Sequence, residues 1–250
     1  MTNHQPLTDQ VALVTGAGRG IGKAIALAYA EAGAAVCCAA RTQAEIEATV
    51  REIEAAGGRG LAVPADVTDF ASVQHMAQAA VEAFGGLDIV VINAGINADR
   101  ATIADSVPEN WQTTFDVNLN GAYYCAKAVI PHLRARGGGK IITVGSGLGH
   151  KGAAGGAAYA CSKAGLWMLT RILAQELWPD NISVNELIPG PVETSMTAPL
   201  TEKRDDNSVF TINSEWIKKP ADVVPLALFL ATQPTVGPSA QSFSLMRRDT

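Results

Sequence analysis

The chain has 250 residues, with 24 acidic and 19 basic side chains, so its formal net charge at pH 7 is −5. This acidic balance argues against a nucleic-acid-binding protein, which needs a basic face. Apolar residue types make up 48% of the chain and charged types 17%, which excludes an intrinsically disordered protein and predicts one globular domain over residues 1–250.

The chain shows no pattern for export, for a membrane or for a metal. Its first ten residues lack the basic segment and apolar run of a secretory signal. The longest apolar run, 223–231, contains Pro225 and is far shorter than the roughly 20 residues of a spanning helix. We therefore expect a cytoplasmic protein with no membrane partner. No histidine pair has metal-ligand spacing, and the cysteines show no CxxC spacing, so we expect no metal and four inert thiols.

Short β-branched runs alternate along the chain with longer Ala-rich segments of helical period, which is typical of repeated βαβ units. The expected strands are 11–15, 35–40, 61–64, 87–92, 141–144, 182–187 and 242–246. The expected helices are 21–32, 43–56, 73–84, 109–136 and 157–177. Because these strands are apolar on both faces, we predict an α/β fold: a doubly wound, Rossmann-type parallel sheet of about seven strands with helices on both faces.

The composition changes once, in a polar and charged stretch over 201–219 that lies between Pro199 and Pro220. In a doubly wound sheet, a long segment after the carboxyl end of a strand lies over the ligand crevice. We therefore expect a substrate lid over about residues 195–219, with Trp216 as the side chain to test for substrate contact.

A glycine-rich turn, TGAGRGIG over residues 15–22, stands between the first expected strand and the first expected helix. Glycines at this place let the backbone turn sharply and approach a pyrophosphate, whose charge is favoured by the helix N-terminus. A plain packing role for the turn is the alternative. The residues expected to contact a dinucleotide are Gly16, Gly18, Arg19, Gly20, Ile21 and Gly22.

The end of the second strand lacks the acidic residue that commonly holds the adenosine ribose of NAD. Ala40 and Arg41 stand there instead. Without a carboxylate a 2′-phosphate is not repelled, and the Arg41 guanidinium offers it a planar set of donors. Arg19 could approach the same phosphate from the other side; alternatively, both arginines are simply solvated. We therefore expect NADP rather than NAD.

Tyr159 and Lys163 are four residues apart in an expected helix, so their side chains share a face. A tyrosine has an ordinary pKa near ~10, and a nearby ammonium group favours its phenolate, which makes Tyr159 a usable acid/base. Ser146 follows the strand over 141–144, at the edge of the sheet where ligands bind. Its hydroxyl could orient a substrate carbonyl.

Together these residues resemble the short-chain dehydrogenase/reductase family, in its compact single-domain branch, over about residues 11–229. The further motifs that carry the resemblance are Asp66-Val67, Asn93-Ala94-Gly95, Asn118 in VNLNG, and Pro189-Gly190-Pro191-Val192-Glu193-Thr194. The resemblance implies a catalytic tetrad of Asn118, Ser146, Tyr159 and Lys163. It also implies cofactor contacts from Asp66, Val67, Asn93, Ala94, Gly95, Tyr159, Lys163, Pro189, Gly190, Val192 and Thr194.

By the same resemblance, hydride passes from NADPH to a carbonyl carbon while Ser146 polarises the oxygen and Tyr159 donates the proton. Lys163 would lower the pKa of Tyr159, bind the nicotinamide ribose and pass protons through a water on Asn118. A non-catalytic NADP-sensing regulator on the same fold is the alternative of another class.

Among subfamilies the sequence looks most like the 3-oxoacyl-carrier-protein reductases, which implies a thioester substrate on acyl carrier protein or CoA. Arg134 and Arg136 are suitable for docking an acidic carrier, but Gln175 stands where those reductases often have a basic residue. A reductase of free small ketones or cyclic alcohols is the runner-up. Relatives are mostly homotetramers, and the departure from the family's usual C-terminal pattern over 237–248 leaves the assembly geometry open.

Overall fold

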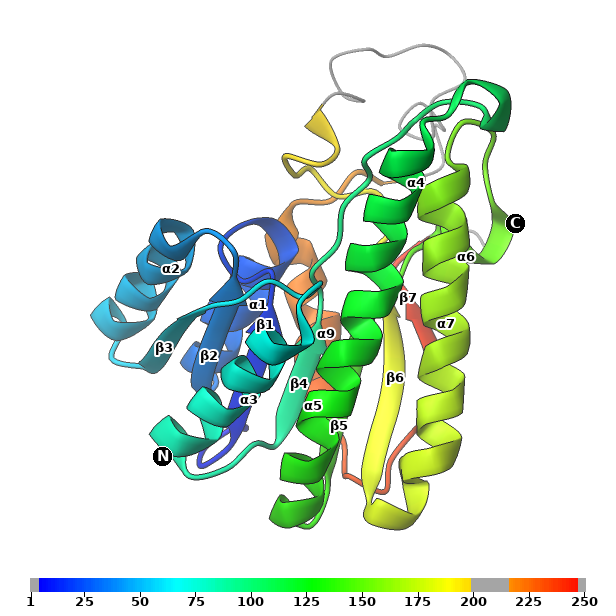
Figure 1. Cartoon of the computed structure of the whole chain (residues 1–250). Helices are drawn as coiled ribbons and strands as arrows, with labels where there is room; N and C mark the ends of the chain where they lie inside the picture. The colour runs from blue at the N-terminus through cyan, green and yellow to red at the C-terminus, as the bar shows by residue number, and fades with distance from the viewer. Residues whose placement is uncertain (1–4, 199–215, 247–250) are drawn as a thin grey trace.

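A computed structural model describes residues 5–198 and 216–246 of the chain (Figure 1). Seven parallel strands form one sheet, in the order β3-β2-β1-β4-β5-β6-β7. The strands are β1 (Val11–Thr15), β2 (Ala35–Ala40), β3 (Arg59–Pro64), β4 (Ile89–Ile92), β5 (Gly139–Val144), β6 (Ile182–Ile188) and β7 (Ser242–Ser244). This order confirms the expected doubly wound, Rossmann-type α/β fold.

Helices cover both faces of the sheet and enclose a separate apolar core on each side. The helices of one face, in front in Figure 1, are α3 (Phe70–Phe84), α4 (Pro108–Phe115), α5 (Gly121–Arg136) and α7 (Ala157–Leu177). The helices of the other face are α1 (Gly20–Glu31), α2 (Gln43–Ala55) and α9 (Val224–Thr232). Because successive strand residues point to opposite faces, Leu13 enters the first core and Val14 the second.

Short helical segments fill several of the connections. They are η1 (Ile103–Asp105), η2 (Asp116–Asn120), α6 (Gly147–Lys151), η3 (Trp178–Asp180) and η4 (Pro220–Val223). The expected helix over 109–136 is present, with the π-helical turn η2 joining α4 to α5 without a break in the helical backbone. The short helix α6 has no apolar period long enough to have been expected.

The sheet places its loops so that one edge can hold a ligand. In β1, β4, β5 and β6 the chain runs in the same direction, so the residues that follow Thr15, Ile92, Val144 and Ile188 meet at the carboxyl edge. Strand β1 pairs with β2 on one side and β4 on the other, so the order of the strands reverses beside β1. Ligands of doubly wound folds bind at such a switch point.

Candidate active site

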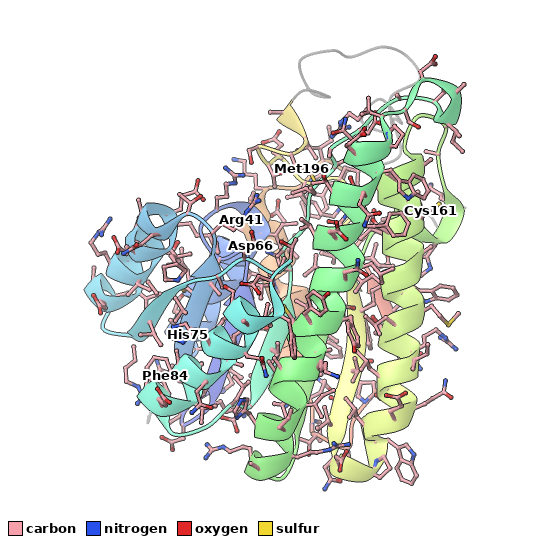
Figure 2. All side chains as sticks on the ribbon, in the orientation of Figure 1. Arg41, Asp66, His75, Phe84, Cys161 and Met196 are labelled. Carbon is pink, nitrogen blue, oxygen red and sulfur yellow. The ribbon has the colours of Figure 1, made fainter. Side chains whose placement is uncertain are left out.

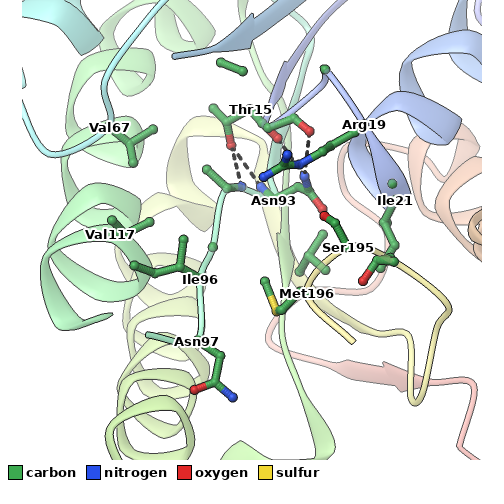
Figure 3. Close-up of a pocket in the computed structure, with 18 of the residues that line it drawn as sticks. Thr15, Arg19, Ile21, Val67, Asn93, Ile96, Asn97, Val117, Ser195 and Met196 are labelled. Atoms are coloured by element: carbon green, nitrogen blue, oxygen red, sulfur yellow. Dashed lines mark hydrogen bonds between the residues drawn. The ribbon is translucent and has the colours of Figure 1, made fainter. Parts of the chain in front are cut away.

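A cleft of about 560 Å³ runs along this carboxyl edge (Figure 3). Its lining includes almost all of the expected cofactor-binding residues: Gly16, Gly18, Arg19, Gly20, Ile21, Arg41, Asp66, Val67, Asn93, Ala94, Gly95, Tyr159, Lys163, Pro189, Gly190, Val192 and Thr194. Three expected site residues, Gly22, Asn118 and Ser146, do not line the cleft. The sequence motifs therefore converge on one elongated site.

The glycine-rich turn is held close to the loop after β4. Asn93 donates from Nδ2 to the Thr15 carbonyl oxygen at 2.8 Å, and its backbone N–H donates to Thr15 Oγ1 at 2.9 Å (Figure 3). Gly16 and Gly20 have φ angles of +67° and +56°, which glycine adopts without strain. A Cβ on Gly22 would overlap the Gly16 carbonyl oxygen, so the turn closes only because both positions lack a side chain.

This geometry fits the pyrophosphate of a dinucleotide. Helix α1 begins at Gly20, in the wall of the cleft, and its N-cap residue Arg19 makes no side-chain hydrogen bond that would cap the helix. The first backbone N–H groups of a helix and its dipole together favour an anion.

The end of the cleft beside β2 and β3, where adenosine is expected, combines two arginines with two carboxylates. Figure 2 shows Arg41 and Asp66 near each other at the ends of β2 and β3. Burial acts to raise the pKa of Asp66, but hydrogen bonds from the N–H and Oγ1 of Thr68 and the charge of Arg41 lower it overall. Arg19 pairs with Glu45 at 3.4 Å, a contact that the sequence did not predict. Glu45 therefore places a negative charge beside the arginines expected to bind a 2′-phosphate.

Asn118 lies in the π-helical turn η2 and ties two parts of the site together. Its Oδ1 accepts from the Ile96 N–H at 2.8 Å, and its Nδ2 donates to the Ile96 carbonyl at 2.9 Å and to Ser162 Oγ at 3.0 Å. Such π turns commonly mark functional positions. Because these three bonds use the side-chain amide, a relay water would have to bind other atoms near Asn118.

Ser146 and Tyr159 meet at the far end of the cleft. Ser146 caps helix α6, where its Oγ accepts from the Leu148 N–H at 3.3 Å, and its hydroxyl is near enough to Tyr159 to act on the pKa of that phenol. Burial raises the pKa of Tyr159, whereas the Ser146 hydroxyl and the charge of Arg100 act to lower it. The expected lowering of this pKa by Lys163 stays a prediction, because burial, Ser146 and Arg100 are the causes that act on Tyr159 here.

Lys163 is almost fully buried one helical turn from Tyr159. Its Nζ donates to the Val144 carbonyl at 2.8 Å and lies 5.9 Å from the centroid of the Tyr159 ring. Burial lowers the pKa of Lys163 to about 8, although the charge of Glu186 acts to raise it. Lys163 therefore titrates near physiological pH, and it does so under the influence of a carboxylate that the sequence analysis did not single out.

The wall beside Tyr159 contains residues that sequence reasoning missed. Ile96, Asn97 and Met196 project into this part of the cleft (Figure 3). Arg100 also lines it and donates from Nη2 to the Met196 carbonyl at 2.8 Å. The Asn97 Oδ1 is buried without a hydrogen-bond donor among the described residues. The only available signal was position, since 96–100 directly follow the Asn93-Ala94-Gly95 motif.

Two expectations concern the substrate: carrier docking by Arg134 and Arg136, and a lid over residues 195–219. Arg134 and Arg136 lie at the end of α5, on the amino edge of the sheet opposite the cleft, and each already pairs with a carboxylate at 2.8 Å. They are therefore not placed to dock a carrier beside the active site. The expected lid over 195–219 falls largely outside the described residues, and Trp216, which is described, does not line the cleft.

The cysteines divide into two groups. Cys37, Cys38 and Cys125 are buried, and burial raises the pKa of Cys38 and of Cys125 to about 12, so these thiols are inert as expected. Cys161 is exposed on the outer face of α7 (Figure 2), so burial does not make this fourth thiol inert. Its neighbours Ser162 and Lys163 face inward, which turns Cys161 away from the core.

Within residues 5–198 and 216–246, no helix is long and apolar enough to cross a membrane. In the same part of the chain, no group of three or more His, Cys, Asp and Glu side chains could hold a metal ion.

The family model described as short chain dehydrogenase matches residues 10–205. The chain is 35% identical over 226 residues to a 3-oxoacyl-[acyl-carrier-protein] reductase of Thermotoga maritima, covering 90% of this chain and 92% of that one. It is 43% identical over 195 residues to the short-chain reductase protein NovJ of Streptomyces niveus, covering 78% and 74% of the two chains. A crystal structure of NAD⁺-bound xylitol dehydrogenase superposes with a TM-score of 0.89 at 26% identity, covering 96% and 98%. With its glycine-rich turn and its Tyr159 and Lys163 at one cleft, the chain belongs to the short-chain dehydrogenase/reductase family, as an NAD(P)-dependent enzyme acting on carbonyl and alcohol groups.

Proposed function

We propose that the protein is an NADP-dependent reductase that converts a ketone to a secondary alcohol, with a 3-oxoacyl thioester or a related carbonyl compound as substrate. The observation that carries this proposal is that Tyr159 and Lys163, with Ser146 acting on the Tyr159 phenol, lie in a cleft that is also lined by Arg41. Tyr159 suits proton donation to a carbonyl oxygen, and Arg41 suits an extra phosphate.

The residues of the cleft support a dinucleotide at this site. The turn over 15–22 and the N-terminus of α1 would hold the pyrophosphate, and Arg19 and Arg41 would bind a 2′-phosphate. When bound, reduced NADP supplies a hydride to the substrate. Glu45 opposes an NADP preference, but Arg41 has no such carboxylate pair among the described residues. The balance of charges therefore favours NADP.

The chemistry at the other end follows from the state of Tyr159. Since burial raises its pKa, Tyr159 is a neutral phenol at physiological pH and has a proton to donate. The Ser146 hydroxyl acts on the same phenol, so a carbonyl oxygen between the two hydroxyls would be both polarised and protonated. Lys163, one helical turn away, supplies a positive charge that stabilises the Tyr159 phenolate left after proton transfer. The Asn118 side chain hydrogen-bonds both the Ile96 backbone and Ser162 of α7, and so holds the loop after β4 against this helix.

The wall formed by Ile96, Asn97, Arg100 and Met196 supports a substrate with both apolar and polar parts. A 3-oxoacyl thioester has this character. A free ketone or cyclic alcohol is the second candidate, because Arg134 and Arg136 lie at the wrong edge of the sheet to dock a carrier protein. Oxidation of NADPH, followed by the absorbance of the reduced nicotinamide, separates the candidates on a panel of thioesters and free ketones. Turnover of neither class, in either direction, would contradict the proposed function.

We also propose a cytoplasmic homotetramer of single-domain subunits, each with a substrate lid over about residues 195–219. Large apolar side chains exposed on α5 and α7 support the assembly: Tyr123 is 45% exposed, Met168 46% and Ile172 44%. Such side chains are commonly covered by a second subunit. Light scattering of the purified protein tests this, and a mass of one subunit would contradict it.

A further inference from the structure

Glu186 is a fully buried carboxylate in the centre of β6 that the proposed chemistry does not use. Its Oε2 accepts from His150 Nε2 at 2.9 Å and from Ser242 Oγ at 2.5 Å. Its Oε1 is buried and has no hydrogen-bond donor among the described residues. A buried carboxylate is costly unless its charge is compensated, so Glu186 calls for a nearby cation.

The free oxygen of Glu186 lies against the backbone of the active site. A Cβ on Gly145 would overlap Glu186 Oε1, so the two residues fit together only because Gly145 has no side chain. Gly145 is the link between Val144, whose carbonyl accepts from Lys163 Nζ, and Ser146. The Glu186 carboxylate therefore packs against the segment 144–146. This segment contains the carbonyl that accepts from Lys163 and the hydroxyl of Ser146.

The charges around Glu186 come from few elements. From α6, His150 faces it, with its ring packed on Trp167 at 5.0 Å between centroids; from β7, the uncharged Ser242 faces it. From α7, Lys163 is the buried cation, and the charge of Glu186 opposes the lowering of the Lys163 pKa by burial. Also from α7, Arg171 lies over the Trp167 ring, with its Cζ 5.6 Å from the ring centroid.

We propose that Glu186 is a positioning residue for the reaction, which acts through Lys163: its buried negative charge, held in place by His150 and Ser242, keeps Lys163 in the ammonium form that the active site needs. This inference rests on the proposed role of Lys163. It assigns a purpose to the glycine at 145, which leaves room for the carboxylate, and to the His150–Glu186 pair.

The pH dependence of kcat/KM tests the inference. Burial lowers the pKa of Lys163 to about 8 while the charge of Glu186 acts to raise it, so without that charge the pKa should be lower still. Glu186→Gln and the apolar Glu186→Met should therefore move the alkaline limb of the profile to lower pH by roughly half a unit or more, with KM little changed at the acid end. Glu186→Asp, which keeps the charge, should restore the limb towards its wild-type position.

Ser242→Ala is the matched control, because it removes one hydrogen bond from Glu186 without changing any charge. Its alkaline limb should stay at the wild-type position even where its thermal stability falls. Alkaline limbs that coincide in wild type, Glu186→Gln and Glu186→Met would overturn the inference. If Ser242→Ala moved the alkaline limb as far as Glu186→Gln does, packing rather than charge would cause the shift, and the inference about Glu186 would also be overturned.

A second readout separates this inference from the proposed function. In protein labelled with ¹³C-lysine, the NMR titration of Lys163, assigned with Lys163→Arg, should have its midpoint at lower pH in Glu186→Gln than in wild type. Retained activity of Lys163→Met would contradict the proposed role of Lys163 itself. Loss of activity in Lys163→Met together with unchanged titration of Lys163 in Glu186→Gln would overturn only the role of Glu186.

Discussion

Replacing Arg41 with alanine should weaken the binding of NADPH much more than the binding of NADH. Arg41 lies at the end of β2, lines the adenosine end of the cleft and makes no ion pair that would compete for its guanidinium among the described residues. A hydrogen bond to a charged group contributes about 1.5–3 kcal/mol, and each 1.4 kcal/mol is a factor of ten. Because Arg41 is exposed, the lower end of this range applies, so the KM for NADPH should rise about tenfold to thirtyfold.

The assay is the initial rate of ketone reduction at varied NADPH and varied NADH, at low and constant ionic strength. The KM for NADH should change less than about threefold, since NADH has no 2′-phosphate for Arg41 to bind. Arg51→Ala is the matched control, because Arg51 is an exposed arginine on α2 that does not line the cleft. Equal losses for the two cofactors, or no loss for NADPH, would refute the assignment of Arg41 to a 2′-phosphate.

Three further predictions concern Glu45, Asn118 and Lys163. Glu45→Gln removes the carboxylate that pairs with Arg19 at 3.4 Å, so the KM for NADPH should fall by about twofold to fivefold, and an increase would contradict the charge argument. Asn118→Ala removes three hydrogen bonds and should lower the free energy of unfolding in urea by about 2–4 kcal/mol; a loss below about 1 kcal/mol would contradict it. The Lys163 pKa lies near 8 in the folded protein and at 10.5 unfolded, so the folded state binds fewer protons between these values. The free energy of unfolding should therefore rise from about pH 8 to about pH 10.5 relative to Lys163→Met, and a parallel pH dependence of the two proteins would contradict the buried ammonium.

The sequence predicted the fold and most of the cleft because these depend on local patterns. Alternation of β-branched and Ala-rich segments is enough to locate the strands and helices along the chain. The spacing of Tyr159 and Lys163 puts both side chains on one face of α7 however the helix packs. The turn over 15–22 was found because its glycines are required by backbone geometry alone.

The residues that were missed or misjudged depend on contacts between distant segments. Arg100 reaches Met196, 96 residues away, and nothing local marks either one as a cleft residue. In the sequence, Glu186 is only a charged residue within an apolar strand. Its contacts with Gly145 and His150 come from segments more than 30 residues away. Arg134 precedes the strand β5, so it had to lie at the amino edge, and the topology of the sheet decides this rather than the basic character of the side chain.

The kcat of Tyr159→Phe tests the central claim most directly, because the change removes one hydroxyl and leaves the ring in place. A positioned acid/base contributes about 10²–10⁴-fold to the rate, so kcat should fall by that factor while the KM for NADPH and the thermal stability stay near wild type. A variant that keeps more than about a tenth of the wild-type kcat would contradict the assignment of Tyr159 as the proton donor.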